Sequence, residues 1–264
     1  MVVKGRRHVN ARTAQRDESA LRWVYGLNAV ARRIEAQPDS VRELRVVVAP
    51  GGRRNRLVAA ATAVGIRVRE DEAASLTRLT GSDAHQGIAA LVEGFDYADL
   101  EGVLGASAGP VLVLDQIQDP HNLGALVRTA AAVGMAAVVI PRHGAVPVTA
   151  AVEKVAAGAV NDVPICRAPN LHRCLLDLRR RNYWCVGLSA RGERNLFELD
   201  LPDQFALVVG GETGLRPLVE STCDVRVSIP QRPDVESLNA AVAGAVAMYE
   251  LARRTRRLPS GKPR

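Results

Sequence analysis

Asn122, Gly124 and Arg128 have types and a spacing that suit the binding of an anionic or polar ligand. They lie within Val111 to Pro141, whose pattern predicts a buried strand, a polar loop, an amphipathic helix and a second buried strand. Asn122 is expected to cap the helix, and Arg128 follows Gly124 by one turn on the same face. A guanidinium beside a glycine could hold an anion, whereas the alternative is a surface Arg on an ordinary α/β helix.

Two later strand ends also carry polar, glycine-rich sequence. The predicted strand Phe205 to Gly210 runs into Gly211-Glu212-Thr213-Gly214, and a later strand runs into Pro230 to Asn239. Ligands bind outside the carboxyl ends of strands in open parallel sheets. Taken singly, these ends could be a tight turn and a helix start capped by Ser237, but three such ends in one domain favour a ligand site.

Several enzyme classes are disfavoured because their motifs are missing from the sequence. It contains no GxGxxG, no GxxxxGK[ST] and no HExxH. The four cysteines lack CxxC spacing, which indicates reduced core thiols rather than a zinc site, so no metal is expected. The sequence has no uncharged apolar run of about 18 residues, so no membrane span is predicted. The basic N-terminus lacks an apolar segment of signal-peptide type, and a cytoplasmic location is expected.

The elements that must position these residues divide the chain into five parts. We expect a basic disordered arm at 1–20, a small α/β unit at 21–93, a linker at 94–110, a larger α/β unit at 111–254 and a basic tail at 255–264. Strand and helix patterns alternate in both units, so the predicted fold class is α/β with a mostly parallel sheet.

The net charge of +7 is concentrated at the two ends of the chain. Residues 1–16 and 253–264 hold eleven basic residues and no acidic one; without them, 24 basic residues face 28 acidic ones. Such arms suit a polyanion such as RNA, and the alternative is a pair of solubilising tails. Aromatic residues make up only 3%, which disfavours a base-stacking platform.

The three strand ends together resemble the motifs of the SpoU/TrmH family, which are S-adenosylmethionine-dependent RNA 2′-O-ribose methyltransferases. The patterns are NxGxxxR at Asn122, Gly124 and Arg128, GxE at Gly210 and Glu212, and IPxxxxxxSLN at Ile229, Pro230, Ser237, Leu238 and Asn239. The sequences VYGLNAV near residue 25, His85-Gln86-Gly87, and KVAAGAVNDVPICR from Lys154 are similar to the RlmB-type branch, which methylates a guanosine of 23S rRNA. The resemblance covers about residues 21–254.

This resemblance implies a fold, a cofactor and partners. The family has a trefoil-knotted SPOUT catalytic domain that dimerises, and an N-terminal domain that resembles small ribosomal proteins. S-adenosyl-L-methionine would lie in the knot, and the partner would be 23S rRNA. The implied cofactor-binding residues are Val209, Gly210, Gly211, Ile229, Pro230, Ser237 and Leu238. The implied RNA contacts are Arg128 together with the basic residues Arg6, Arg7, Arg53 and Arg54.

The resemblance also implies roles for four polar residues. Arg128 matches the catalytic Arg, whose guanidinium would bind a phosphate or stabilise the alkoxide that forms from the ribose hydroxyl. Asn122, Glu212 and Asn239 would fix the ribose, Arg128 and the cofactor. A tRNA ribose methyltransferase is an alternative within the family. A catalytically silent RNA-binding protein of the same fold is an alternative from a different functional class, although such a protein would have no need of all four residues.

The chain departs from the family at three positions. The loop from Glu212 to Arg216 is one residue shorter than usual, which bears on the cofactor pocket. Ala241 stands where a small polar residue is common. Asn28 stands where the RlmB-type branch commonly has His, which bears on the choice of RNA.

Overall fold

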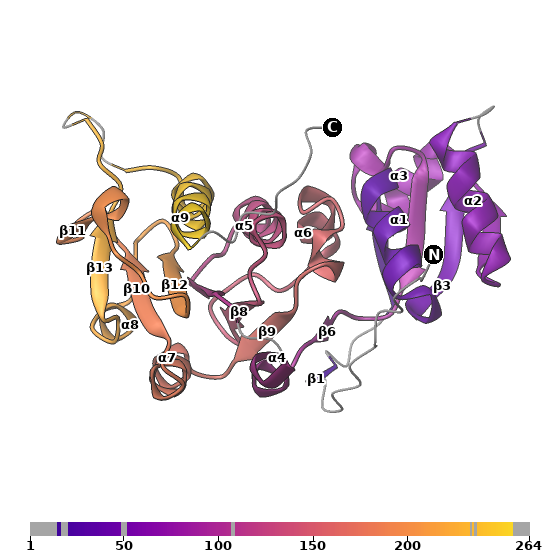
Figure 1. Cartoon of the computed structure of the whole chain (residues 1–264). Coiled ribbons are helices and arrows are strands. Elements are labelled where there is room, and N and C mark those ends of the chain that lie inside the picture. The colour runs from indigo at the N-terminus through magenta and orange to yellow at the C-terminus, as the bar shows by residue number, and fades with distance from the viewer. Residues whose placement is uncertain are drawn as a thin grey trace, which may run out of the picture.

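The computed structural model describes residues 15–16, 21–48, 52–106, 109–232, 234 and 237–255. They form two α/β units that lie side by side and are joined through β6 (Asp96–Tyr97) (Figure 1). Most of the arm predicted at 1–20 lies outside the described residues, as does the tail from 256. Within the arm, Gln15–Arg16 form β1, which pairs antiparallel with β6. The prediction of disorder therefore differs from the structure at these two residues, whose backbone is paired.

The smaller unit is a mixed four-stranded sheet with helices. Its elements are β2 (Arg22–Tyr25), α1 (Leu27–Ala36), β3 (Val41–Val46), α2 (Arg53–Ala63), β4 (Arg67–Glu70), α3 (Ala73–Thr80) and β5 (Ile88–Val92), with 3-10 turns at Pro38–Ser40 and Asp83–His85. The strand order is β2-β5-β3-β4, in which β5 is antiparallel to both neighbours and β3 is parallel to β4.

The His85-Gln86-Gly87 turn ties the helices of the smaller unit to its sheet. Gln86 adopts a left-handed conformation with φ of 56°, and its Oε1 accepts a hydrogen bond of 2.8 Å from the Leu27 amide at the start of α1. The Arg54 guanidinium donates to the carbonyls of Val47 and Gln86 at 2.7 and 3.0 Å. A Cβ on Gly87 would lie 2.7 Å from Arg54 Cζ, so glycine is required there.

The larger unit is built around a seven-stranded sheet in which every pairing is parallel. Its strand order is β11-β13-β10-β12-β7-β8-β9. The strands are β7 (Val111–Asp115), β8 (Ala137–Pro141), β9 (Ile165–Ala168), β10 (Trp184–Leu188), β11 (Arg194–Asn195), β12 (Phe205–Gly210) and β13 (Val225–Ser228). The helices are α4 (Leu100–Ala106), α5 (Pro120–Val133), α6 (Ala150–Val155), α7 (Leu171–Arg180), α8 (Pro217–Glu220) and α9 (Ala240–Arg254), with 3-10 turns at Ala159–Asn161 and Leu196–Glu198. The predicted fold class, α/β with a mostly parallel sheet, is confirmed.

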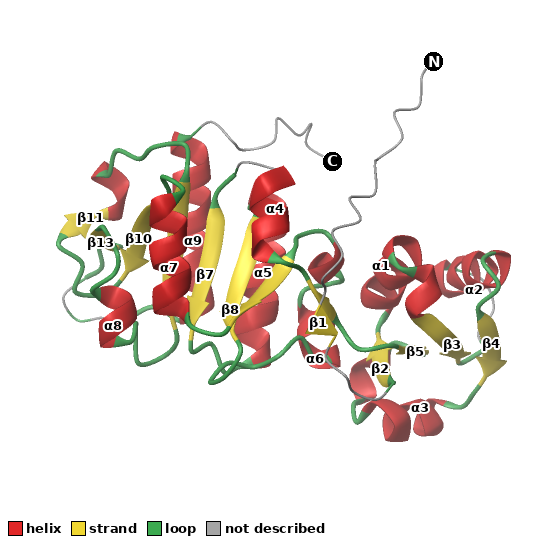
Figure 2. Cartoon of the chain, turned by 90° about the horizontal axis from the view of Figure 1, so that it is seen from below, coloured by secondary structure: helices red, strands yellow, loops and turns green. Residues whose placement is uncertain are grey.

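The central strands of this sheet are covered on both faces. In β7, Leu112 and Leu114 pack against the layer of α5, α6 and α9, while Val111 and Val113 pack against the layer of α4, α7 and α8. In Figure 1, α9, α5 and α6 lie above the sheet, and α8, α7 and α4 lie below it. Figure 2 views the molecule from below and shows α7 and α4 in front of the strands. Burial on both faces explains the continuous apolar runs of these strands.

Two helices have N-cap residues different from those predicted from the sequence. Asp119 caps α5, since its Oδ1 accepts from the His121 amide at 3.0 Å, and Asn122 lies in the first turn. Pro120, with its fixed φ and no amide hydrogen, suits the first position of the helix. Asn239 rather than Ser237 caps α9. No helix of the described residues is long and apolar enough to span a membrane.

Candidate functional site

Three predicted strand ends meet at one edge of the larger sheet. β7 and β12 are adjacent and in register, with Asp115 opposite Gly210, and β13 lies beyond β10 in the same parallel sheet. Because all the strands are parallel, their carboxyl ends lie at the same edge. The starts of α5 and α9 follow β7 and β13 in the chain, so this edge gathers the loops predicted to bind ligand.

Asn122 and Asn239 are joined at this edge. Asn239 Nδ2 donates a hydrogen bond of 3.0 Å to Asn122 Oδ1. Asn239 Oδ1 accepts from the amides of Ala241 and Val242 at 2.9 and 3.3 Å and thereby caps α9. Asn122 is only 8% exposed. The first and third sequence patterns, which are 117 positions apart, therefore form one polar contact.

The glycines of the second pattern permit very close backbone approaches. A Cβ on Gly210 would lie 2.3 Å from the Gly214 carbonyl carbon, and one on Gly211 would lie 2.4 Å from Gln116 O. The Gly211 amide donates to Asp115 O at 2.8 Å. A side chain at Gly211 would force the loop away from the end of β7, and one at Gly210 would clash with the loop's own backbone at Gly214, which explains the two glycines.

An ion pair that sequence reasoning missed holds this loop in place. The fully buried Asp115 carboxylate accepts hydrogen bonds of 2.8 Å from the amide and from Nε of Arg216. Arg216 ends the loop that follows β12, and the pair fixes this loop to β7. The signal was present in the sequence, because Asp115 is the one charged residue at the end of an otherwise apolar strand.

The third strand end offers backbone groups to which no other described residue is hydrogen-bonded. Within the described part of the chain, Ile229, Gln231 and Leu238 make no backbone hydrogen bond with another residue. Ile229 and Leu238 are half-buried, whereas Pro230 and Ser237 are exposed. Val209 is buried, and a Cβ on Gly244 of α9 would lie 3.6 Å from its side chain. Unpaired amides and carbonyls beside apolar side chains form a donor set suited to a heterocycle with polar edges.

Arg128 and Glu212 have no side-chain hydrogen bond to the asparagine pair. Both side chains are exposed, and neither forms a hydrogen bond or ion pair with another described residue. Arg128 follows Asn122 by six residues, or about 9 Å along the helix axis, and projects from a different face. Gly124 serves helix packing, because a Cβ there would lie 2.7 Å from Val155 Cβ of α6.

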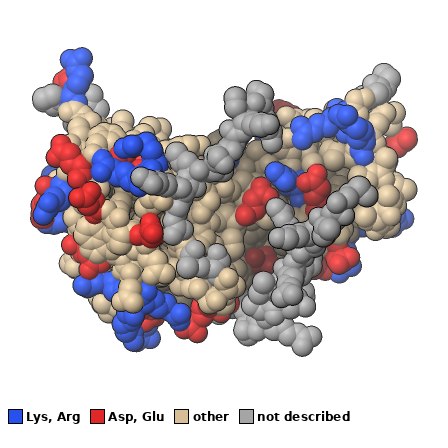
Figure 3. Space-filling view, in the orientation of Figure 1, with Lys and Arg blue, Asp and Glu red and all other residues tan. Residues whose placement is uncertain are grey.

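The predicted RNA-binding arginines have different surroundings. Arg53 is exposed at the start of α2, whereas Arg54 is half-buried and bonded to two carbonyls, which gives it a structural role. Blue side chains gather on the upper part of the smaller unit in Figure 3. Arg56, which the sequence interpretation did not include, is also exposed on α2. Arg6 and Arg7 lie outside the described residues.

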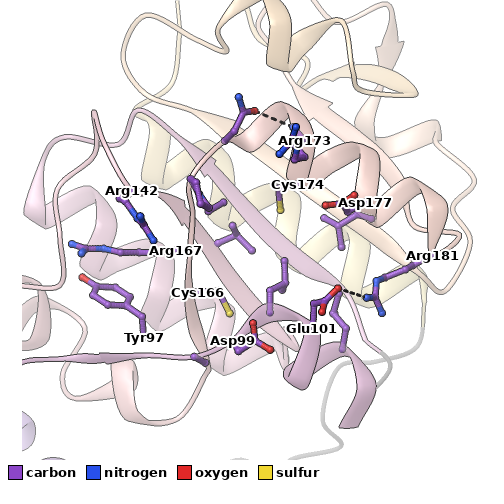
Figure 4. Close-up of a pocket in the computed structure, with 18 residues that line it drawn as sticks. Tyr97, Asp99, Glu101, Arg142, Cys166, Arg167, Arg173, Cys174, Asp177 and Arg181 are labelled. Carbon is purple, nitrogen blue, oxygen red and sulfur yellow. Dashed lines mark hydrogen bonds and ion pairs between the residues drawn. The ribbon is translucent and has the colours of Figure 1, made fainter. Parts of the chain in front are cut away.

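A separate cavity of about 530 Å³ lies between α4, α7 and the ends of β8 and β9, away from the strand ends described above. Figure 4 shows Tyr97, Arg142 and Arg167 on one side of it and Asp177 and Arg181 on the other. The Arg167 guanidinium lies 4.1 Å from the centre of the Tyr97 ring. None of the predicted site residues lines this cavity.

Comparison with known proteins identifies the family. The model of the SpoU rRNA Methylase family matches residues 109–249, and the model described as RNA 2'-O ribose methyltransferase substrate binding matches residues 23–98. The chain belongs to the SpoU rRNA methylase family. The SpoU rRNA methylase model spans the seven-stranded unit with its three strand ends, and the substrate-binding model spans most of the smaller unit.

Individual SpoU relatives match over nearly their whole length. The 23S rRNA (guanosine-2'-O-)-methyltransferase RlmB of Xanthomonas axonopodis pv. citri is 42% identical over 240 residues, which cover 88% of this chain and 96% of the relative. The RlmB protein of Ralstonia nicotianae is 37% identical over 92% of this chain and 99% of the relative. The crystal structure of the SpoU methyltransferase AviRb from Streptomyces viridochromogenes, in complex with the cofactor AdoMet, shares the fold with a TM-score of 0.74 at 24% identity, over 88% of this chain and 89% of that one.

Proposed function

We propose that this protein transfers a methyl group from S-adenosyl-L-methionine to a ribose 2′-hydroxyl of 23S rRNA, at a guanosine. The observation that carries the proposal is the hydrogen bond of 3.0 Å between Asn122 and Asn239, which joins two of the family's motifs at one edge of the sheet. Membership of the SpoU family supports methyl transfer. The names of the RlmB relatives support 23S rRNA and guanosine.

The residues at the strand ends fit S-adenosyl-L-methionine, which supplies an activated methyl group when bound. The backbone groups of Ile229, Gln231 and Leu238, which no other described residue pairs, suit the polar edges of adenine, and the half-buried side chains of Ile229 and Leu238 suit its faces. Gly210 and Gly211 keep the loop against β7, so that its backbone stays in a fixed place. Val209, Pro230 and Ser237 complete the proposed binding segments.

The chemical demand falls on the ribose hydroxyl, which is barely acidic in water. Asn122 and Asn239 orient the polar groups of the substrate, and this positioning contributes to the rate of the reaction. Arg128 is exposed and has no described partner, so its guanidinium is available to a phosphate or to the developing alkoxide. Glu212, exposed on the neighbouring loop, is available to orient Arg128 once RNA is bound.

Domain roles, assembly and location complete the proposal. Residues 21–93 form the RNA-binding unit and 111–254 the methyltransferase unit, with the 94–110 segment as linker. The path from β13 back to α9, beside α5, favours the knotted topology of the family. Val242 and Tyr249 of α9 are each 50% exposed, which favours a homodimer through this helix. The action on ribosomal RNA favours a cytoplasmic location.

Two alternatives remain open to experiment. Residues 23–98 match a substrate-binding model, and an N-terminal RNA-binding domain is expected for the RlmB-type branch. This match disfavours a tRNA ribose methyltransferase of the minimal type. A silent RNA-binding protein is disfavoured because the Asn122–Asn239 contact and the unpaired backbone groups form a site that RNA binding does not need.

Calorimetry with S-adenosyl-L-methionine, followed by methyl transfer to unmethylated 23S rRNA and to tRNA, tests the proposal. We expect cofactor binding and methylation of a guanosine ribose in 23S rRNA only. Arg128→Ala should lower the rate about a thousandfold with an unchanged melting temperature, in the range for the loss of one preorganised donor. Arg180→Ala on α7, on the opposite layer, is the matched control and should keep full activity. Absence of cofactor binding at millimolar concentration would support the silent alternative.

A further inference from the structure

The junction between the two units is formed by a short stretch of the larger unit. β2 and α1 of the smaller unit lie against α6 and the 3-10 turn Ala159–Asn161. Figure 1 shows α6 between α5 and the smaller unit. This stretch belongs to the KVAAGAVNDVPICR sequence and the residues just before it, for which the proposed reaction provides no role.

Glu153 of α6 is the buried carboxylate of the junction. Its side chain is 0% exposed, and its Oε1 accepts a hydrogen bond from Arg22 Nη2 of β2. The fully buried Arg33 donates through Nε to Ser40 Oγ at 2.9 Å and through Nη2 to Glu93 O at 3.3 Å. Burial lowers the pKa of Arg33, and the negative charge of Glu153 opposes that change. One carboxylate thus pairs with Arg22 directly and acts on Arg33 through its charge alone.

Steric and aromatic contacts surround this charged centre. A Cβ on Gly158, whose φ is 86°, would lie 2.5 Å from Arg32 Cβ and 3.1 Å from Asn28 O, so α1 packs directly on the backbone of the larger unit. The Lys154 ammonium lies 5.2 Å from the centre of the Tyr25 ring. Tyr25 is buried in a cluster against which Ala150 of α6 packs. These contacts allow one relative orientation of the two units and disfavour sliding.

The same helix packs against the helix that carries the candidate catalytic arginine. A Cβ on Gly124 of α5 would lie 2.7 Å from Val155 Cβ and 3.0 Å from Val152 O of α6. Arg128 follows Gly124 by four residues and so projects from the same face of α5. One face of α6 therefore contacts the smaller unit, and another contacts the face of α5 that presents Arg128.

We propose that Glu153 is a positioning residue that holds the RNA-binding unit in one orientation on α6, so that RNA bound by that unit reaches Arg128. The proposal rests on the proposed function. Without the carboxylate, the half-buried Arg22 would lose the group to which it donates, and the buried Arg33 would lose one of the negative charges that offset its burial, so opening of the junction would hydrate both. A loosely tethered unit presents its RNA to the site at a lower effective concentration. The KM for RNA therefore rises, while cofactor binding and the methyl-transfer step do not change.

The test uses Glu153→Gln in the full chain, with unmethylated 23S rRNA as substrate. We expect the KM for RNA to rise about tenfold, with kcat and the cofactor Kd within about twofold of the wild type. Spin labels at Ala60→Cys on α2 and Arg180→Cys on α7 should report a single narrow distance in the wild type and a broad distribution in the variant. Glu35→Gln is the matched control, because Glu35 is 65% exposed on α1 and, among the described residues, pairs only with Arg32, at 3.6 Å.

Arg22→Gln provides a second variant if Glu153→Gln fails to fold, since Arg22 retains 21% of its side-chain exposure. The double variant should raise KM no further than the worse single variant, because the two residues form one pair. An unchanged KM and an unchanged distance distribution in these variants would overturn the proposal. A parallel fall in kcat and cofactor affinity would also overturn it, since Glu153 would then support the catalytic fold. If the wild type binds the cofactor but transfers no methyl group, the proposed function fails, and the distance measurement still decides the role of Glu153.

Discussion

Asn239 uses both ends of its amide, since Nδ2 donates to Asn122 Oδ1 at 3.0 Å while Oδ1 accepts from the first amides of α9. The helix cap fixes which end of the amide carries the oxygen. Because of the cap, Asn239 can only donate to Asn122, and the Asn122 oxygen is held toward Asn239. The Asn122 amide nitrogen is then directed away from that contact, where it is available as a donor to substrate.

Asn239→Asp separates these two functions of Asn239. A carboxylate keeps the cap of α9, so we expect a melting temperature close to that of the wild type. It cannot donate to Asn122, whose amide must then turn its nitrogen toward the introduced carboxylate and away from substrate. We expect methyl transfer to fall about a hundredfold, as for other lost donors at a reacting centre. Thermal melting and single-turnover rates measure the two effects.

Asn239→Ala loses the cap as well and should lower the free energy of unfolding by about 1 kcal/mol. Ser237→Ala is the control, because Ser237 is exposed and the cap of α9 lies at Asn239. Equal melting temperatures for Asn239→Ala and Ser237→Ala would contradict the assigned cap.

The Asp115–Arg216 pair predicts a second effect, on the loop between β12 and α8. Arg216→Ala leaves the fully buried Asp115 carboxylate with only the backbone amide of residue 216 as a donor. Loss of a partner from a buried pair costs about 3–5 kcal/mol, and we expect about 2 kcal/mol here because Arg216 is partly exposed. Chemical denaturation measures the change. We also expect weaker cofactor binding in calorimetry, and unaltered affinity would show that the loop does not depend on this pair.

Much of the fold could be predicted from the sequence because its signals are local. The apolar runs of β7 and β12 and the glycine that ends α5 each indicate an element within a few residues. The contact of Asn122 with Asn239 could not be derived in this way, since the two residues are 117 positions apart and only the strand order brings them together. The helix start at Pro120 was missed because both Asp119 and Asn122 are good caps, and the position of the proline decides between them.

Glu250 on α9 predicts a pH-dependent contribution to stability. Hydrogen bonds from Arg253 come first among the causes that lower its pKa from 4.5 to about 2, and bonds from Arg254 add to them. Because the pKa is lower in the folded state, the stabilisation is present above about pH 4.5 and is lost as the pH falls toward 2. We expect about 1 kcal/mol at neutral pH, reduced by solvent screening of Arg253.

Glu250→Gln tests this contribution. The free energy of unfolding of the variant should be lower than that of the wild type at pH 7, and the two should converge as the pH falls from about 4.5 to about 2. A difference that is constant over this range would assign the effect to packing rather than to charge.

Gly124 and Gly105 are both helical glycines, and they predict opposite responses to alanine. In an open helical position, alanine is favoured over glycine by about 0.5–1 kcal/mol. No atom of another described residue lies within 4 Å of a Cβ on Gly105 of α4, so Gly105→Ala should stabilise the protein by about that amount. A Cβ on Gly124 would lie 2.7 Å from Val155 Cβ and 3.0 Å from Val152 O, and the backbone atom cannot move without α6.

We therefore expect Gly124→Ala to destabilise the protein by about 1–3 kcal/mol, the usual range for overpacking. Displacement of α6 should also disturb the junction that α6 forms with the smaller unit, so the KM for RNA should rise together with the loss of stability. Denaturant unfolding of both variants, each compared with the wild type, measures the two opposite signs. If Gly124→Ala raised the free energy of unfolding, α6 would have moved to make room for the added methyl group. That result would count against α6 as a rigid connection between the RNA-binding unit and Arg128.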